Sequence, residues 1–135
     1  QFTPMPSGAT FRVPWQVDDG ASAANAILLD QTSNTSIRTE SYVSGAGTNR
    51  AVATISAGNN KVAAAWQDSD WSISANGGAV GTNVAAGGIP SIATPVLRFG
   101  ASSASGSNSL NNPIQYSAAW CAQRCPDSEL RSMAA

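Results

Sequence analysis

The 135-residue sequence contains no histidine and few charged residues. Charged side chains make up 11% of the chain, against about 25% in a typical soluble protein. Without histidine, triads with a histidine base, histidine metal sites and histidine proton switches are excluded. Seven Lys and Arg against eight Asp and Glu form no basic stripe for a nucleic-acid backbone, so we expect no nucleic-acid partner.

Long apolar runs are also missing. None approaches the roughly 20 residues of a membrane-spanning helix, and no signal-peptide or lipidation motif is present, so we expect no membrane span. Cysteine is scarce as well, with Cys121 and Cys125 four residues apart. This pair is compatible with a local disulfide or with two reduced thiols, whereas a zinc site would need two further ligands.

Small neutral residues replace the missing charges. Ala, Ser, Gly, Asn and Thr supply 74 of the 135 residues. A surface with few ions suits large permanent contacts, because few charges must be desolvated on assembly. In the interior, small side chains bury little area, so the large ones must supply most of the burial energy, about 1.5–3 kcal/mol each. We predict Trp66, Trp71 and Trp120 as the main core anchors.

Short alternating segments separated by turn residues predict an all-β protein. Asn76-Gly77 predicts a type I′ turn, since both residues tolerate a positive φ. Many short strands with turns every 8–12 residues are typical of an antiparallel β-sandwich. We expect residues 10–135 to form this one domain, and residues 1–9 to form an N-terminal arm. The predicted strands are residues 10–17, 26–29, 36–43, 50–56, 61–67, 71–75, 79–82, 96–100 and 114–120.

One short helix is predicted at the C-terminal end, over residues 126–133. Pro126 suits a first helical turn, and Asp127 and Glu129 complement the positive end of the helix dipole. The apolar stripe that includes Leu130 must dock on a sheet, because about two turns of helix are not stable alone.

Four motifs follow one another in the second half of the chain. They are AAAWQDSDWSISANGGAVGT at residues 63–82, LRFGA at 97–101, LNNPI at 110–114, and Ala119-Trp120 followed by CPDSEL at 125–130. In this order they resemble the concanavalin A-like (laminin-G-like) jelly-roll domains of structural proteins from tailed phages, prophages or gene-transfer agents. Two positions depart from that pattern. Asn112 replaces the usual glycine, and Cys121-Ala122-Gln123 stands where a basic pair is common.

The resemblance implies an antiparallel β-sandwich of jelly-roll, concanavalin-like type with one short C-terminal helix. It also implies a non-enzymatic subunit at the surface of a virus particle: a capsid decoration, a head fibre or a tail-associated protein. Such a subunit stabilises the particle, adheres to host polysaccharide, or does both. Its partners are other virion proteins, in a homo-oligomer or bound to the capsid. The alternatives are a dedicated carbohydrate-binding module and, third, a fragment of a glycan-degrading enzyme.

Asp68 and Asp70 are two carboxylates separated by a single residue. Both are oxygen ligands of the kind that Ca²⁺ takes, and a carboxylate pair could also serve in glycoside hydrolysis. Asp-Ser-Asp is, however, good turn chemistry, and we favour the turn. Asp18-Asp19-Gly20 has the same two interpretations, again with the turn favoured. We therefore expect no cofactor, with calcium as the one option.

Aromatic residues are the candidates for contact with a carbohydrate or a partner. Tyr42 alternates onto a polar face with Arg38 and Glu40, and Trp15 lies on an earlier strand. We predict Tyr42, Arg38 and Trp15 as contact residues. We predict no catalytic residue, because the sequence has no nucleotide-binding glycine loop and no G-x-S-x-G nucleophile elbow.

Overall fold

A computed structural model of the chain describes residues 12–20, 24–84, 88–100 and 124–135. The predicted arm at residues 1–9, the strand at 114–120 and the LNNPI motif lie outside the described residues, as do Trp120 and Cys121. The described elements are β1 (Arg12–Asp18), β2 (Ala26–Ser33), β3 (Ser36–Val43), β4 (Ala46–Thr54), β5 (Val62–Gln67), β6 (Asp70–Ala75), β7 (Gly81–Asn83), β8 (Val96–Phe99) and α1 (Asp127–Met133).

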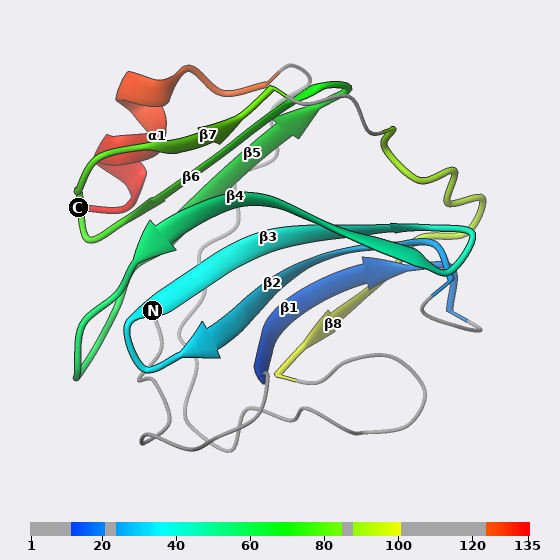
Figure 1. The fold of residues 1–135 in the computed structure, drawn as a ribbon, viewed down its shortest axis with the longest axis horizontal. Helices are drawn as coiled ribbons and strands as arrows, with labels where there is room; N and C mark the ends of the chain where they lie inside the picture. Colours follow the sequence, from blue (N-terminus) through cyan, green and yellow to red (C-terminus); the bar gives the residue numbers. More distant parts are fainter. Residues whose placement is uncertain (1–11, 21–23, 85–87, 101–123) are drawn as a thin grey trace.

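The strands form two antiparallel sheets (Figure 1). One has the order β4-β3-β2-β1-β8 and the other the order β5-β6-β7. The predicted all-β sandwich with one short helix is thus confirmed. Within the described ranges, β1 to β4 form a meander in one sheet and β5 to β7 a meander in the other. The jelly-roll order, in which successive strands alternate between sheets, is not found among these strands and stays an expectation.

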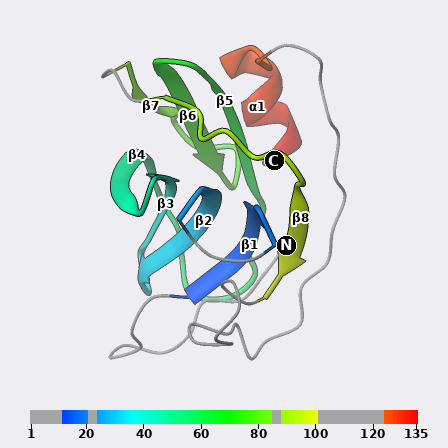
Figure 2. The ribbon, with the colours of Figure 1, turned by 90° about the vertical axis from the view of Figure 1, so that its right-hand side faces the viewer.

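The hydrophobic core lies between the two sheets, which Figure 2 shows as separate layers. Ile27, Leu29 and Ile37 project from the five-stranded sheet, and Trp71 and Ile73 from the three-stranded sheet. The alternation predicted for residues 71–75 therefore points inward as expected.

Two of the three predicted core anchors fall within the described chain. Trp71 is fully buried. Trp66 packs against the core but is only half-buried. Alternation along one strand predicts which face a side chain lies on, but not how much of it stays exposed.

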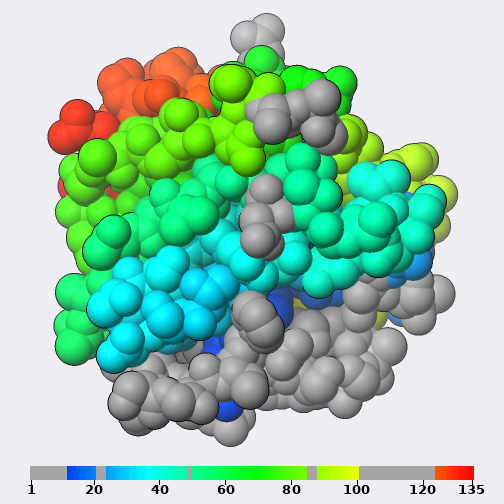
Figure 3. Space-filling model, in the orientation of Figure 1, coloured from blue at the N-terminus to red at the C-terminus, as the bar shows by residue number. Residues whose placement is uncertain are grey.

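On one side of the sandwich, β7 lies directly against β4. Figure 3 shows their surfaces side by side on the face of Figure 1. Asn83 Nδ2 donates a hydrogen bond of 3.1 Å to the carbonyl oxygen of Arg50. A Cβ on Gly81 would lie 1.9 Å from the carbonyl oxygen of Val52. Glycine at position 81 is therefore what allows the two sheets to meet.

The turn predicted at Asn76-Gly77 is present, with φ of 51° and 68° at these residues. It is closed by a 2.9 Å hydrogen bond from Gly78 N–H to the carbonyl oxygen of Ala75. The return strand begins at Gly81 rather than at residue 79, because Ile73 and not Ala75 is the last residue of β6 that pairs with it.

α1 covers the side of the three-stranded sheet that faces away from the core (Figure 1). Leu130 packs there on Ala65 of β5, with Ala63 beside it. The two faces of β5 therefore pack on different elements: Ala64 and Trp66 face the core, whereas Ala63 and Ala65 face the helix. The small alanine side chains let the helix approach closely. No helix in the described ranges is long and apolar enough to cross a membrane.

Candidate functional site

Three tryptophans form a stacked row that links the two sheets. The ring centroids of Trp15 on β1 and Trp66 on β5 are 5.3 Å apart, with the rings tilted by 33°. Those of Trp66 and Trp71 on β6 are 6.1 Å apart and nearly parallel. Trp71 is buried, whereas Trp66 and Trp15 are half-buried. The row therefore runs from the core to the surface on the side of the sandwich away from the β4–β7 contact.

The exposed end of this row continues onto β8, the last strand of the five-stranded sheet among the described strands. Phe99 pairs with Trp15 and Leu97 with Val17, so these four side chains lie on one face. We call them the edge strip: Trp15, Val17, Leu97 and Phe99. Phe99 is 43% exposed and Leu97 40% exposed, and none of the four carries a charge. An exposed apolar strip on a rigid backing is typical of an interaction site.

A charge clamp on the other face of the sheet holds β8 in place. Arg98 Nε lies 2.8 Å from Asp18 Oδ2, and the Arg98 guanidinium also donates to the Gly20 carbonyl at 3.2 Å. Asp18 accepts two more hydrogen bonds of 2.7 Å, from Gln16 Nε2 and Gly20 N–H. Both Asp18 oxygens are thus already occupied, which suits a structural clamp and not the calcium interpretation of Asp18-Asp19-Gly20.

The pKa of Asp18 reflects this clamp. Burial alone would raise the pKa, but hydrogen bonds from Arg98, Gly20 N–H and Gln16, together with the charge of Arg98, outweigh it and hold the pKa below its ordinary value. The folded state thus binds this proton less tightly than the unfolded chain. The stability from the clamp is complete above the ordinary pKa of 3.8 and is lost as the pH falls through the folded value.

Removing the clamp should loosen β8. We expect Arg98→Met to lower the free energy of unfolding by about 2 kcal/mol, because the buried Asp18 carboxylate loses its charged partner. Amide hydrogen exchange should accelerate in β8 more than in β2. Arg131→Met, on the exposed side of α1, is the matched control and should change neither quantity appreciably. Equal exchange rates in β8 of the wild type and Arg98→Met would contradict the clamp.

The predicted turn at Asp68 is present, with Asp68 and Ser69 as the two residues between the paired Gln67 and Asp70. Asp68 is exposed, and Ser69 has a positive φ of 61°. No group of three or more His, Cys, Asp or Glu that could hold a metal is found in the described part of the chain. Calcium binding at Asp68 and Asp70 stays a prediction.

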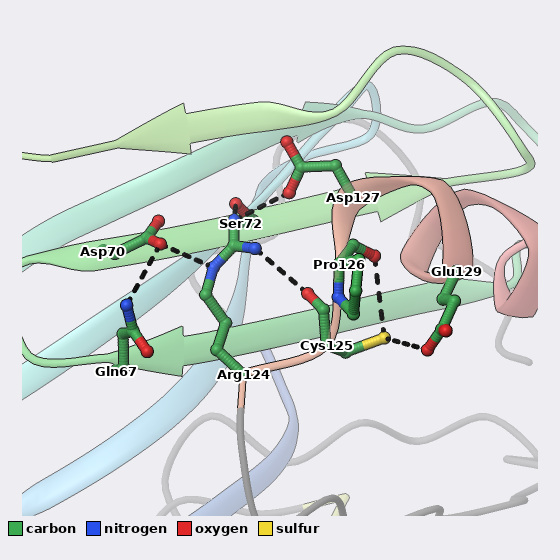
Figure 4. A network of polar contacts seen from close by, with 8 residues as sticks. All are labelled: Gln67, Asp70, Ser72, Arg124, Cys125, Pro126, Asp127 and Glu129. Atoms are coloured by element: carbon green, nitrogen blue, oxygen red, sulfur yellow. Dashed lines mark hydrogen bonds and ion pairs between the residues drawn. The ribbon is translucent and has the colours of Figure 1, made fainter.

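Asp70 belongs to a network centred on Arg124 (Figure 4). Arg124 Nε lies 2.9 Å from Asp70 Oδ2, and Arg124 NH2 lies 2.7 Å from Asp127 Oδ1 and contacts Ser72 Oγ. Its NH1 donates to the carbonyl oxygen of Cys125 at 3.0 Å. The guanidinium therefore ties the start of α1 to β6, and Asp70 is committed to this structural role.

The Cys125 thiol is buried beside α1 and lies 3.5 Å from Glu129 Oε2. Cys121, the other cysteine of the predicted pair, lies outside the described residues.

The three predicted contact residues do not form one surface. In register, Trp15 pairs with Leu29, whereas Arg38 pairs with Asp30. Trp15 therefore faces the core side of the five-stranded sheet, and Arg38 and Tyr42 face the opposite side. Arg38 is ion-paired with carboxylates. The half-buried ring of Tyr42 packs over Gly47, so closely that a Cβ on that glycine would lie 2.8 Å from Tyr42 Cε1. Among the three, only Trp15 joins the edge strip.

Phe99 and Leu97 are the contact candidates that sequence reasoning missed. Their strand is short and apolar on both faces apart from Arg98, so alternation could not assign an exposed side. Only the pairing of β8 with β1, 80 residues earlier in the chain, brings Phe99 beside Trp15.

Comparison with protein families gave no match. Comparisons with curated proteins and with solved structures gave no match either.

Proposed function

We propose that this chain is a non-enzymatic subunit of a virus particle that binds polysaccharide through its edge strip. The single observation that carries the binding function is the uncharged, partly exposed strip of Trp15, Val17, Leu97 and Phe99, backed by the tryptophan row. The place in a virus particle, as a capsid decoration, head fibre or tail-associated protein, is supported by the resemblance of the sequence motifs.

The chemistry of the strip suits sugar rings. One face of many pyranose rings exposes C–H groups, and aromatic side chains pack well on such faces because they offer a large flat apolar area. Phe99 provides exposed ring area, and Trp15 is held in place by Trp66. A side chain fixed before binding loses less conformational entropy on binding, so this backing favours affinity.

The carboxylates argue for a structural rather than a catalytic role. Asp70 is ion-paired with Arg124, and Asp68 lies on an exposed turn. Glycoside hydrolysis needs two carboxylates that act together, and the ion pair with Arg124 occupies Asp70. The proposal therefore assigns binding and assembly to this chain, and no reaction.

The binding half of the proposal is tested with Phe99→Ala. We expect the wild type to be retarded by at least one neutral polysaccharide in affinity electrophoresis, and the variant to bind it at least tenfold more weakly, a loss of about 1.4 kcal/mol. Val52→Ala, which removes an exposed apolar side chain on β4, is the matched control and should bind like the wild type. Equal binding by Phe99→Ala, or no retardation with any neutral or acidic polysaccharide, would refute it.

The particle half is tested separately, by quantifying the chain in purified virus particles. A fixed copy number per particle is expected. Absence from particles, with polysaccharide binding intact, would instead establish the second candidate, a dedicated carbohydrate-binding module, which the same edge strip favours.

A further inference from the structure

The outer face of the five-stranded sheet, opposite the core, carries polar side chains that are buried. Gln16 on β1 is fully buried, Asp30 on β2 is 2% exposed, and Glu40 on β3 is also buried. Buried polar atoms normally have hydrogen-bond partners, so any that lack one require an explanation.

Two carboxylates on this face share one arginine. Arg38 Nε and Nη2 lie 3.0 and 2.8 Å from Asp30 Oδ2, and Arg38 Nη2 lies 3.4 Å from Glu40 Oε2. The second oxygen of Asp30, Oδ1, is buried and has no hydrogen-bond partner. One cation therefore faces two anions, and half of the more buried anion is unsatisfied.

A second unsatisfied acceptor lies on the neighbouring strand. Gln16 Nε2 donates to Asp18 Oδ2 at 2.7 Å, but Gln16 Oε1 is buried without a partner. Gln16 pairs with Leu28, and Asp30 lies two residues further along β2 on the same face. Such diagonal neighbours are about 7–8 Å apart at Cα, within reach of long side chains. An added proton would turn Asp30 into a hydrogen-bond donor, and Gln16 Oε1 is an unsatisfied acceptor on the neighbouring strand.

We propose that the folded protein holds a proton on Asp30 Oδ1, donated to Gln16 Oε1, and releases it as the pH rises towards neutrality. The outer face of the sheet is then a pH-sensitive element of the fold. The balance is simple: a carboxylic O–H bond forms at Asp30 when the proton is taken from water and breaks when the proton is returned.

The surrounding groups agree with this assignment. Burial raises the pKa of Asp30 to about 6; Arg38 lowers it and Glu40 raises it. The two flanking strands carry three other described titratable groups. On β3, Tyr42 shares a hydrogen bond with Glu40. On β1, Asp18 is ion-paired with Arg98, and Arg12 lies across from Gln31 of β2. None of them donates to Asp30 Oδ1.

The sign of the effect on stability follows from linkage. The folded protein binds this proton more tightly than the unfolded chain, whose Asp pKa is near 3.8. The stabilisation is therefore complete below that value and is lost as the pH rises through about 6. The Asp18 clamp acts in the opposite direction, but at lower pH.

The test is a ¹³C NMR titration of the Asp30 carboxyl group in the intact chain, together with urea unfolding from pH 4 to 8. We expect a titration midpoint near pH 6 and a urea midpoint that falls over this range. Asp30→Asn places an amide donor where the O–H would be, and should abolish most of the fall. Gln16→Met removes the acceptor and should shift the Asp30 midpoint downwards.

Asp68→Asn, on an exposed turn, is the matched control and should leave the pH profile unchanged. A titration midpoint of Asp30 near 4 in the wild type would overturn the proposal. An unchanged titration midpoint of Asp30 in Gln16→Met would also overturn it. This second measurement tests the proposal even if Asp30→Asn does not fold.

Discussion

Replacement of Gly81 by alanine is expected to lower the free energy of unfolding by at least about 3 kcal/mol, at the upper end for overpacking. The added Cβ would lie 1.9 Å from the carbonyl oxygen and 2.9 Å from the carbonyl carbon of Val52. Both are backbone atoms of β4, so no side-chain rotation can relieve the clash. β7 must separate from β4, which also breaks the hydrogen bond from Asn83 to the Arg50 carbonyl.

Urea unfolding of the two glycine variants measures this effect. Gly88→Ala is the matched control, because nothing lies within 4 Å of its Cβ and its φ is not positive. This control should unfold within about 0.5 kcal/mol of the wild type, as is usual for surface substitutions. A similarly small change in Gly81→Ala would show that the two sheets do not meet at Val52.

Truncation of Trp71 to alanine is expected to cost about 3–5 kcal/mol, the usual range for a large buried aromatic. Trp71 stacks on Trp66, and Arg50 lies over its ring with Cζ 5.4 Å from the centroid. Arg50 is itself buried. Truncation therefore leaves both a cavity and a buried cation without its aromatic partner.

Trp71→Phe separates the two contributions. It keeps an aromatic face under Arg50 and removes the indole N–H, which is buried without an acceptor. We expect it to destabilise by less than half as much as Trp71→Ala in the same unfolding assay. If the alanine variant lost less than about 1 kcal/mol, Trp71 would not be the centre of the core.

Much of the fold follows from local sequence patterns. The hairpin over residues 62–75 has strong alternation and a two-residue turn, and both strands were predicted within one residue of their observed ends. Ser36–Val43 was predicted with the observed bounds. Pro14, which has no N–H to donate to a neighbouring strand, lies within the register shift between Arg12 and Trp15. These are features that neighbouring residues decide.

The edge strip depends on pairing between distant segments, which alternation does not report. We predict Tyr42 as a contact residue because it alternates with the polar residues Arg38 and Glu40. In the structure these two side chains are ion-paired with each other and largely buried, and Tyr42 itself is half-buried. A polar neighbour therefore does not guarantee an exposed face. Among the described strands, β8 lies at the edge of its sheet, where it pairs with β1, and Phe99 is exposed there.

The scarcity of charge also has a structural consequence. All 15 charged residues lie in the described ranges, and several are grouped in ion pairs around Asp18, Asp30 and Arg124. Those charges fasten β8, join β2 to β3 and attach α1, whereas the edge strip carries none. The described ion pairs thus hold elements of the fold together, and the proposed contact surface is uncharged.

The most direct test of the binding surface is a ¹H–¹⁵N NMR titration of the chain with the neutral polysaccharide that retards it most strongly. We expect the Trp15 indole signal and the backbone amides of β1 and β8 to shift first and furthest, while those of the β5–β6 turn stay in place. Shifts confined to that turn or to the face of Arg38 and Tyr42 would contradict this expectation.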